Sequence, residues 1–392
     1  MIAHVAVWCI GLGLGVAAYA YLGYPLILKV LGHFIGRPLR LEEPAEWPLI
    51  SYMVPAYNEQ ASIAGALDCI LASDYPAERR QIVVGSDAST DRTDEIVRGY
   101  ADRGVELLRM PERSGKTATE NALRRLMRGE IIVHVDAAVQ IAPSATRLLV
   151  MAFCDPEVGV ASSRDVSTPS PGEISDSGES SYVGYEMWVR RVETRVYGVT
   201  GVSGSFFANR NILHTELVPA ALSRDFAAAL VARRQGLRAV SVDQAVCFVP
   251  RSPSLRREYR RKVRTMARGL ETLWYHRDLL NPSRYGLFAW MLWSHKLVRW
   301  LVPWAVAAGA IALGALTFDS ALAHEALVAA LVVLAAAALG WFLPERIHRP
   351  FVVGFPAYVV SGVVAGLHAW TKALRGELNP IWEPTRRGTD ER

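Results

Sequence analysis

Four short segments in the first half of the chain contain residue types that bind phosphorylated, hydroxyl-rich ligands. Three of them carry carboxylates and one carries a lysine, and they are Pro55 to Glu59, Ser86 to Asp91, Arg113 to Lys116 and Asp136 to Ala138. Carboxylates accept hydrogen bonds from sugar hydroxyls and bind divalent cations, and a lysine pairs with phosphate. A nucleoside diphosphate joined to a sugar would use all of these groups, provided that the fold brings them together.

The elements around these segments indicate how they are brought together. Short apolar runs typical of strands lie at 49–54, 81–86, 105–109 and 130–135, and segments of helical periodicity follow them at 59–71, 93–101, 116–128 and 143–153. This alternation is typical of a parallel sheet with helices on both faces, in which ligands bind beyond the carboxyl ends of the strands. We therefore expect the four segments to share one edge of one sheet.

Each of these residues also has a structural interpretation when taken alone. Asp91 is placed to cap the helix that starts near Thr93, Tyr57 to pack against the next helix, and Lys116 to be an ordinary exposed lysine. His134 is expected to be packed rather than to bind a ligand. A phosphate-binding loop at Gly115-Lys116-Thr117 is excluded, because the required earlier glycine falls on Met110.

The apolar residues are concentrated at the two ends of the chain and predict a membrane protein. The chain is 51% hydrophobic, and the stretch from Val5 to Val30 has no charge before Lys29, which is enough to span a bilayer. A cleaved signal peptide would need a basic region before a shorter apolar core, and neither residues 1–4 nor the length of this stretch supplies that. Three later stretches have the length of a membrane helix: Leu297 to Phe318, Ala321 to Leu343 and Phe351 to Ala369.

The placement of basic residues predicts that the central domain is cytosolic, because loops on that side carry an excess of Lys and Arg. These residues follow the first stretch or precede the later ones: Arg37, Arg40, Arg251, Arg256, Arg257, Arg260, Arg261, Lys262 and Arg264. If the last stretch simply spanned the membrane, the basic residues before it and those after it could not both be cytosolic. One C-terminal segment is therefore expected to be interfacial or re-entrant. The residues concerned are Arg346, Arg349, Arg375, Arg386 and Arg387.

The predicted layout has four parts. Residues 1–45 form a transmembrane helix and linker, 46–282 a cytosolic α/β domain, 283–300 a Trp-rich interfacial segment, and 301–392 transmembrane helices and a cytosolic tail. The net charge of +5 is too small to indicate binding to nucleic acid. The four cysteines are far apart and have no spacing typical of a metal or redox site.

The order of the motifs resembles glycosyltransferase family 2, which includes cellulose, chitin, hyaluronan and poly-N-acetylglucosamine synthases. The motifs are Pro-Ala-Tyr-Asn-Glu, Ser-Asp-Ala-Ser-Thr-Asp, Ser-Gly-Lys-Thr and Val-Asp-Ala-Ala, and the resemblance runs from about Leu49 to Leu270. The membrane helices and Trp382 to Arg387 also resemble bacterial members. The resemblance implies an α/β domain of the GT-A fold with a mixed, mostly parallel sheet, flanked by transmembrane helices.

The resemblance also implies an activity. The expected reaction is inverting transfer of a sugar from a nucleotide-sugar, expected to be a UDP-sugar, to a saccharide or lipid-linked acceptor. It would take place on the cytosolic face of a bacterial plasma membrane, in contact with membrane lipid.

The resemblance assigns roles on the donor side. Pro55, Tyr57, Glu59 and Asp87 are expected to hold the nucleoside, and Lys116 to face the diphosphate.

Asp136 matches the first acid of the family's Asp-x-Asp metal motif, whose carboxylates hold a divalent cation, Mg²⁺ or Mn²⁺, on the donor phosphates. Ala138 replaces the second acid, which puts the dependence on this cofactor in doubt.

The acceptor side is expected further along the chain. Gly204 and Ser205 lie in a glycine-containing segment that resembles the place where the acceptor approaches the backbone, although a glycine in a strand also marks bulges. Trp188 precedes it on a predicted helix, where it either stacks on an acceptor sugar or packs in the core.

Asp225 matches the aspartate of the family's Thr-Glu-Asp motif, the proposed general base, and otherwise would cap the helix that runs to Arg234. The glutamate of that motif is Arg224 here, a reversal of charge that the sequence does not explain.

Arg261 and Arg264 lie where processive synthases have Gln-x-x-Arg-Trp, and a guanidinium suits a diphosphate. The same basic segment would also suit anionic lipid. Thr265 replaces the tryptophan, which argues against a processive polysaccharide synthase.

Two other classes of function remain beside the transferase. One is a non-catalytic relative that binds nucleotide-sugar and acts as a partner subunit, which the changed residues Ala138, Arg224, Arg261 and Thr265 would fit. The other is a nucleotidyltransferase or dinucleotide enzyme, but the glycine fingerprint that it needs after the first strand is absent.

Overall fold

A computed structural model of the chain describes residues 2–168, 177–214, 218–250, 254–344 and 350–377. The predictions made for Trp382 to Arg387 and for three further arginines fall outside these residues: Arg251, Arg346 and Arg349. The chain divides into two compact units. One contains 1–30, 252–270 and 280–377 and is helical, and the other contains 31–251 and 271–279 and is built on a sheet.

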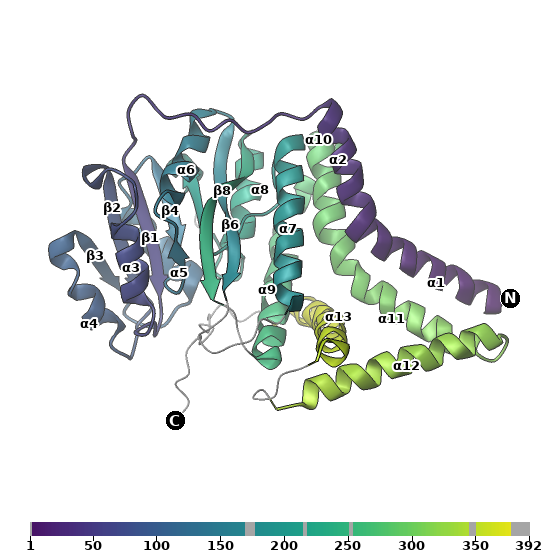
Figure 1. The fold of residues 1–392 in the computed structure, drawn as a ribbon. Helices are drawn as coiled ribbons and strands as arrows, with labels where there is room; N and C mark the ends of the chain where they lie inside the picture. The colour runs from purple at the N-terminus through teal and green to yellow at the C-terminus, as the bar shows by residue number, and fades with distance from the viewer. Residues whose placement is uncertain (1, 169–176, 215–217, 251–253, 345–349, 378–392) are drawn as a thin grey trace. The chain divides into compact units, whose positions relative to one another are not determined.

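The sheet has eight strands in the order β3-β2-β1-β4-β7-β6-β8-β5 (Figure 1). Their bounds are β1 Ile50–Ala56, β2 Arg80–Ser86, β3 Val105–Arg109, β4 Ile131–Val135, β5 Gln140–Ile141, β6 Val158–Thr168, β7 Phe206–Arg210 and β8 Arg238–Pro250. Strands β1 to β4 run parallel to their neighbours among themselves, as do β6 and β8, whereas β7 is antiparallel to β4 and β6. The mixed, mostly parallel sheet expected from the sequence is confirmed.

Helices cover both faces of this sheet, as buried parallel strands require. They are α3 Ile63–Leu71, α4 Thr93–Arg98, α5 Lys116–Leu123, α6 Ala145–Met151, α7 Ser177–Val196 and α8 Arg224–Arg234. On one face, Tyr52 and Val54 of β1 pack with side chains of α3, α4 and α6. On the other, Met53 packs with Leu123 of α5.

The first four strands match the predicted runs closely, but the helices are shorter than predicted. The helix predicted over 116–128 ends at Leu123, and a 3₁₀ turn follows it. The backbone N–H groups of Arg128 and Gly129 then donate to Ser51 Oγ at 3.2 and 2.8 Å, which turns the chain into β4. A contact with β1 therefore limits this helix, and local periodicity does not report such a contact.

The helical unit contains four helices long and apolar enough to cross a membrane among the described residues: Ala3–Phe34, Pro282–Leu316, Ala321–Phe342 and Phe351–Arg375. They comprise α1 Ile2–Ala18, α2 Tyr24–Phe34, α10 Pro282–Leu292, α11 Arg299–Leu316, α12 Ala321–Phe342 and α13 Phe351–Arg375. The second includes residues 283–300, and their interfacial position stays a prediction. Amphipathic α9, Leu255–Tyr275, carries the basic segment and belongs to this unit as far as Leu270.

Two π-helical turns, Tyr19–Gly23 and Trp293–Val298, interrupt the first two of these long helices. Polar groups join the turns: Tyr19 Oη lies 2.7 Å from Ser294 Oγ, and Trp290 Nε1 donates to Tyr19 Oη at 3.1 Å. Such pairing is expected of polar groups in an apolar environment, where no water is available to bind them.

Candidate active site

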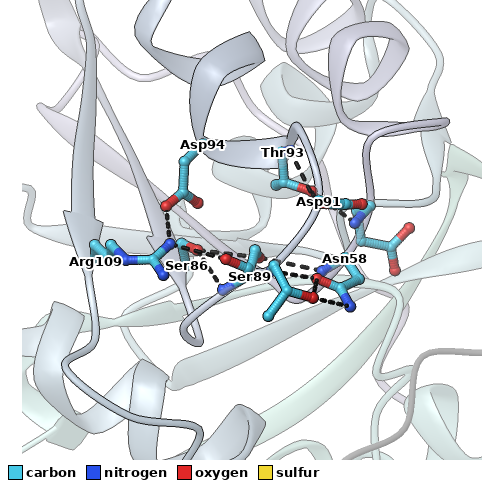
Figure 2. Close-up of polar contacts among 9 residues, drawn as sticks. Asn58, Ser86, Ser89, Asp91, Thr93, Asp94 and Arg109 are labelled. Carbon is cyan, nitrogen blue, oxygen red and sulfur yellow. Dashed lines mark hydrogen bonds and ion pairs between the residues drawn. The ribbon is translucent and has the colours of Figure 1, made fainter.

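The loops that follow β1 and β2 are joined by hydrogen bonds between their side chains and backbone (Figure 2). Asn58 donates its backbone N–H to Ser89 Oγ at 3.1 Å and accepts the N–H of Thr90 at 2.8 Å. Asp91 accepts the backbone N–H of Thr93, the first residue of α4, at 2.9 Å. Asp91 thus binds the N–H of the first helical residue, as expected of a cap, although Arg92 occupies the N-cap position itself. These bonds join the two loops into one platform.

The predicted nucleoside residues of β1 lie on this platform. Pro55 is buried in β1 beside Gly85 of β2. Tyr57 is half-buried, and the guanidinium of Arg113 lies 4.0 Å from the centre of its ring, a cation–π contact. Glu59 accepts a hydrogen bond from Ser62 Oγ at 2.5 Å. The sequence did not single out Arg113, which joins the loop before α5 to the end of β1.

Asp87 is buried at the end of β2, and its carboxylate holds the loop that leads into α5. Its Oδ1 accepts the backbone N–H of Ser114 at 2.7 Å, and its Oδ2 accepts that of Gly115 at 2.8 Å. Lys116 is the next residue. Asp87 therefore fixes the start of α5, and its expected contact with a nucleoside stays a prediction.

Lys116 and Asp136 form an ion pair at the carboxyl edge of the sheet. Lys116 Nζ lies 2.5 Å from Asp136 Oδ1 and 3.4 Å from the carbonyl oxygen of Gly204. Asp136 donates its backbone N–H to the carbonyl of Ser205 at 2.9 Å. This contact follows from the pairing of β7 with β4, in which Phe206 lies opposite Val135.

Asp225 reaches the same place from the first turn of α8. Ser223 occupies the N-cap position, and its hydroxyl donates to Asp225 Oδ1. A Cβ added to Gly204 would lie 2.9 Å from Asp225 Oδ2, so a side chain at position 204 would displace this carboxylate. Asp225 is therefore not the N-cap residue of the helix, and it lies beside the segment predicted to meet the acceptor.

Three carboxylates keep Lys116 charged. Burial by itself lowers the pKa of Lys116, but Asp136, Glu120 and Asp225 together raise it above its ordinary value. Lys116 therefore carries a positive charge throughout the physiological pH range, as a residue that faces a diphosphate must.

The roles expected of Trp188, Arg261 and Arg264 stay predictions. Trp188 is half-buried on α7, with its ring 5.9 Å from that of Tyr185. Arg261 and Arg264 lie on the part of α9 that belongs to the helical unit, where Arg261 binds both carboxylate oxygens of Glu258, at 2.7 and 2.8 Å.

Asp165 of β6 is a polar residue of this region that the sequence did not reveal. It is half-buried, and its carboxylate accepts hydrogen bonds from Ser203 Oγ at 2.5 Å and Ser163 Oγ at 3.2 Å. Burial raises its pKa despite these bonds. Its hydrogen bond with Ser203 helps to fix the position of the 203–205 segment. Because it lies within a strand and does not follow one, its position in the sequence gave no signal.

The donor atoms of the site determine whether it fits a divalent cation. Within the parts of the chain that the structure describes, no group of three or more His, Cys, Asp or Glu side chains is arranged to hold a metal ion. Asp136 Oδ1 already pairs with Lys116, and Ala138 has no ligand atom. Asp136 fits a cation that donor phosphates also bind, since Mg²⁺ sites commonly use one or two carboxylates with substrate phosphates. It does not fit a cation held tightly by protein alone.

Comparison with known proteins places part of the chain in a family. Residues 51–216 match the family model described as glycosyl transferase family 2. These residues form a glycosyltransferase family 2 domain. A mannosyltransferase from Pyrobaculum calidifontis, solved in complex with GDP-Man and Mn²⁺, has a TM-score of 0.72 over 96% of this chain and 100% of its own, at 23% identity. This likeness shows that the glycosyltransferase domain has the GT-A fold.

Two curated relatives match parts of the glycosyltransferase domain. The beta-monoglucosyldiacylglycerol synthase of a Nostoc species is 26% identical over 193 residues, which are 47% of this chain and 41% of the relative. A dolichyl-phosphate beta-glucosyltransferase of Trichomonas vaginalis is 39% identical over 95 residues, 22% of this chain and 28% of the relative. The chain thus spans less than half the length of these relatives.

We expect Gly204→Ala to lower the thermal unfolding midpoint, because the new methyl group overlaps the Asp225 carboxylate, and overpacking typically costs about 1–3 kcal/mol. Gly184→Ala is the matched control, since an added Cβ there meets no atom within 4 Å. The loss should shrink when Gly204→Ala is made in an Asp225→Ala background. An equal loss in both backgrounds would show that Asp225 does not approach this glycine.

Proposed function

We propose that this protein is an inverting glycosyltransferase that moves a sugar from a nucleotide-sugar, expected to be a UDP-sugar, to a lipid-linked or saccharide acceptor. The observation that carries this proposal is the meeting of Lys116, Asp136 and Asp225 at the carboxyl edge of the sheet. A cation for the diphosphate and a separate carboxylate for the acceptor are the two requirements of the reaction.

The reaction needs one proton transfer and one displacement. The acceptor hydroxyl gives its proton to Asp225 while its oxygen attacks the anomeric carbon from the side opposite the nucleotide. The new bond joins the anomeric carbon to the acceptor oxygen, and the bond to the diphosphate breaks. Lys116 stabilises the charge on the departing diphosphate. A divalent cation, when bound, would be held by Asp136 and would supply further positive charge there.

The donor is expected to be held by the platform that follows β1 and β2. Tyr57 offers an aromatic face that is fixed by Arg113, and Pro55, Glu59 and Asp87 lie in or beside the same loops. Arg261 and Arg264 are proposed to reach the diphosphate from α9, and Trp188 with Ser205 to meet the acceptor. Since Asp87 already binds the loop before Lys116, a nucleoside that touched Asp87 would also stabilise the position of the lysine.

The proposed setting is the cytosolic face of a bacterial plasma membrane, with the predicted boundaries at residues 45, 282 and 300. The four long apolar helices support a multi-pass anchor. Both curated relatives carry names that include a lipid, monoglucosyldiacylglycerol in one and dolichyl phosphate in the other. An acceptor embedded in the bilayer would suit a catalytic domain that is anchored next to it.

A non-catalytic partner subunit is the second candidate. The substitution at Ala138 favours it, because a metal ligand of the family motif is missing. The close grouping of Lys116, Asp136 and Asp225 disfavours it, since partly buried charges that do no chemistry carry an energetic cost.

Asp225→Asn is expected to lower turnover by about 10²–10⁴-fold, the usual loss for a positioned base, without loss of donor binding. The measurement is nucleotide release from a panel of nucleotide-sugars in detergent, with donor binding followed by calorimetry. Asp102→Asn, a change at an exposed position in the 3₁₀ turn Ala101–Arg103, is the control and should keep full turnover. Near wild-type turnover by Asp225→Asn would exclude this residue as the base.

Ala138→Asp should tighten binding of Mn²⁺ or Mg²⁺, because it supplies a second carboxylate beside Asp136. The wild-type protein should show weaker metal dependence than the variant when activity is titrated with either cation. Ala138→Leu adds bulk without a ligand atom and should leave the midpoint at the wild-type value. If the midpoints of the Asp variant and the wild type coincide, position 138 does not face the cation.

The product is expected to contain one or a few transferred sugars. Thr265 has no aromatic face on which the end of a growing chain would stack, and the four long apolar helices of the described residues are few for enclosing a polysaccharide channel. Sizing the product of the purified protein with its identified donor measures this. Long polymer from the first turnovers, with no pool of short intermediates, would contradict it.

A further inference from the structure

The ion pair between Glu120 and Arg224 is almost completely buried close to Lys116 of the proposed active site. Glu120 belongs to α5 and Arg224 begins α8, and their side chains are 2% and 7% exposed. Glu120 Oε2 lies 2.9 Å from Arg224 Nε. Burial alone would raise the pKa of Glu120, but Arg224, followed by His134 and Lys116, lowers it to about 2. Glu120 is therefore ionised at any physiological pH, whereas burial lowers the pKa of Arg224 from its high ordinary value despite the nearby Glu120.

Further bonds tie α5 to the segment that leads into α8. Arg224 Nη2 donates to the side-chain oxygen of Asn121, and Asn121 Nδ2 donates to the carbonyl of Val218 at 2.8 Å. Thr117 Oγ1 donates to the carbonyl of Leu222 at 3.3 Å. The position of Arg224 thus follows that of α5, and the next residue in the chain is Asp225.

Glu120 also contacts the central strand. His134 of β4 places its Nδ1 3.7 Å from Glu120 Oε1 and its Nε2 2.8 Å from Asn209 Oδ1. Its ring stacks on Phe207 of β7 with centres 4.2 Å apart. Burial lowers the pKa of His134 despite its partners, so the imidazole is neutral. This agrees with the packed role expected for His134.

Each member of this cluster stands close in sequence to one residue of the active site. Glu120 follows Lys116 by one helical turn and lies on the same face of α5. His134 precedes Asp136 by two positions on β4, and Arg224 precedes Asp225. A single buried carboxylate thus contacts the three elements that carry the lysine, the strand-end acid and the proposed base.

We propose that Glu120 and Arg224 are positioning residues for the glycosyl transfer, which hold Lys116, Asp136 and Asp225 in register. The inference rests on the proposed function. It also gives a physical reason for the charge reversal at position 224: an arginine there has a buried glutamate as its partner. Breaking such a pair leaves one charge buried without a partner, whereas replacing both members with uncharged side chains is far less costly.

The test compares Glu120→Gln, the double variant Glu120→Gln with Arg224→Met, and the exposed control Glu106→Gln. Glu106 also pairs with an arginine, Arg128, but at the surface, where such pairs contribute little. The double variant should unfold near the wild-type temperature while its kcat stays about 10²-fold low, since a displacement of roughly 1 Å has that effect, and its donor KM should change little. The control should match the wild type. Wild-type kcat in the double variant would show that the pair only stabilises the fold, and would overturn the proposal.

A second measurement does not depend on turnover. Backbone hydrogen exchange followed by mass spectrometry reports how firmly the beginnings of α5 and α8 are held. We expect faster exchange at the start of α8 in the folded double variant, because the ion pair that ties Arg224 to α5 is lost, while exchange in the control stays at the wild-type rate. A folded double variant with wild-type exchange at this segment would overturn the positioning role. A wild-type protein that turns over no donor would instead refute the proposed function, and the exchange profile would still decide this inference.

Discussion

The antiparallel pairing of β7 with β4 is the constraint on which the site depends. Strands β1 to β4 all end at one edge, and β7 begins at that edge because it runs the other way. The loop before β7 is thereby placed beside the residue that follows β4, and Asp136 binds the backbone of Ser205. A shift of β7 by one residue would turn its side chains to the opposite faces and move Gly204 away from Asp225.

The charged side chains near the β4–β7 pair lie next to side chains of opposite charge. Lys116 is set among carboxylates, and Arg224 lies against Glu120, so that no described charge at the centre of the site depends on water alone. Such arrangements are expensive to desolvate and contribute little net stability. They fix geometry, because a displaced member would leave its partner buried and unpaired. This is the property that a site for displacement chemistry requires.

The sequence predicted the first half of the domain well and the second half poorly. Strands β1 to β4 alternate with helices, so periodicity and strand ends were enough to gather Lys116 and Asp136 at one edge. The position of Asp225 came from a motif resemblance, because α8 is distant from those strands in sequence. The cluster of Glu120, His134 and Arg224 depends on packing between elements that are separated in sequence, and it was not predicted from the sequence. Asp165 had no signal in the sequence either.

The strand order has a consequence for the newly made chain. Strand β6 leaves the ribosome before β7, yet β7 separates it from β4 in the finished sheet. The open edge of β4 therefore waits for its native partner while the intervening segment is synthesised, for several seconds at the usual rate of about 5–20 residues per second. An exposed edge is a template for wrong pairing. Translation speed between β4 and β7, and chaperones that shield strand edges, should thus affect the yield of folded protein more than they would for the parallel half alone.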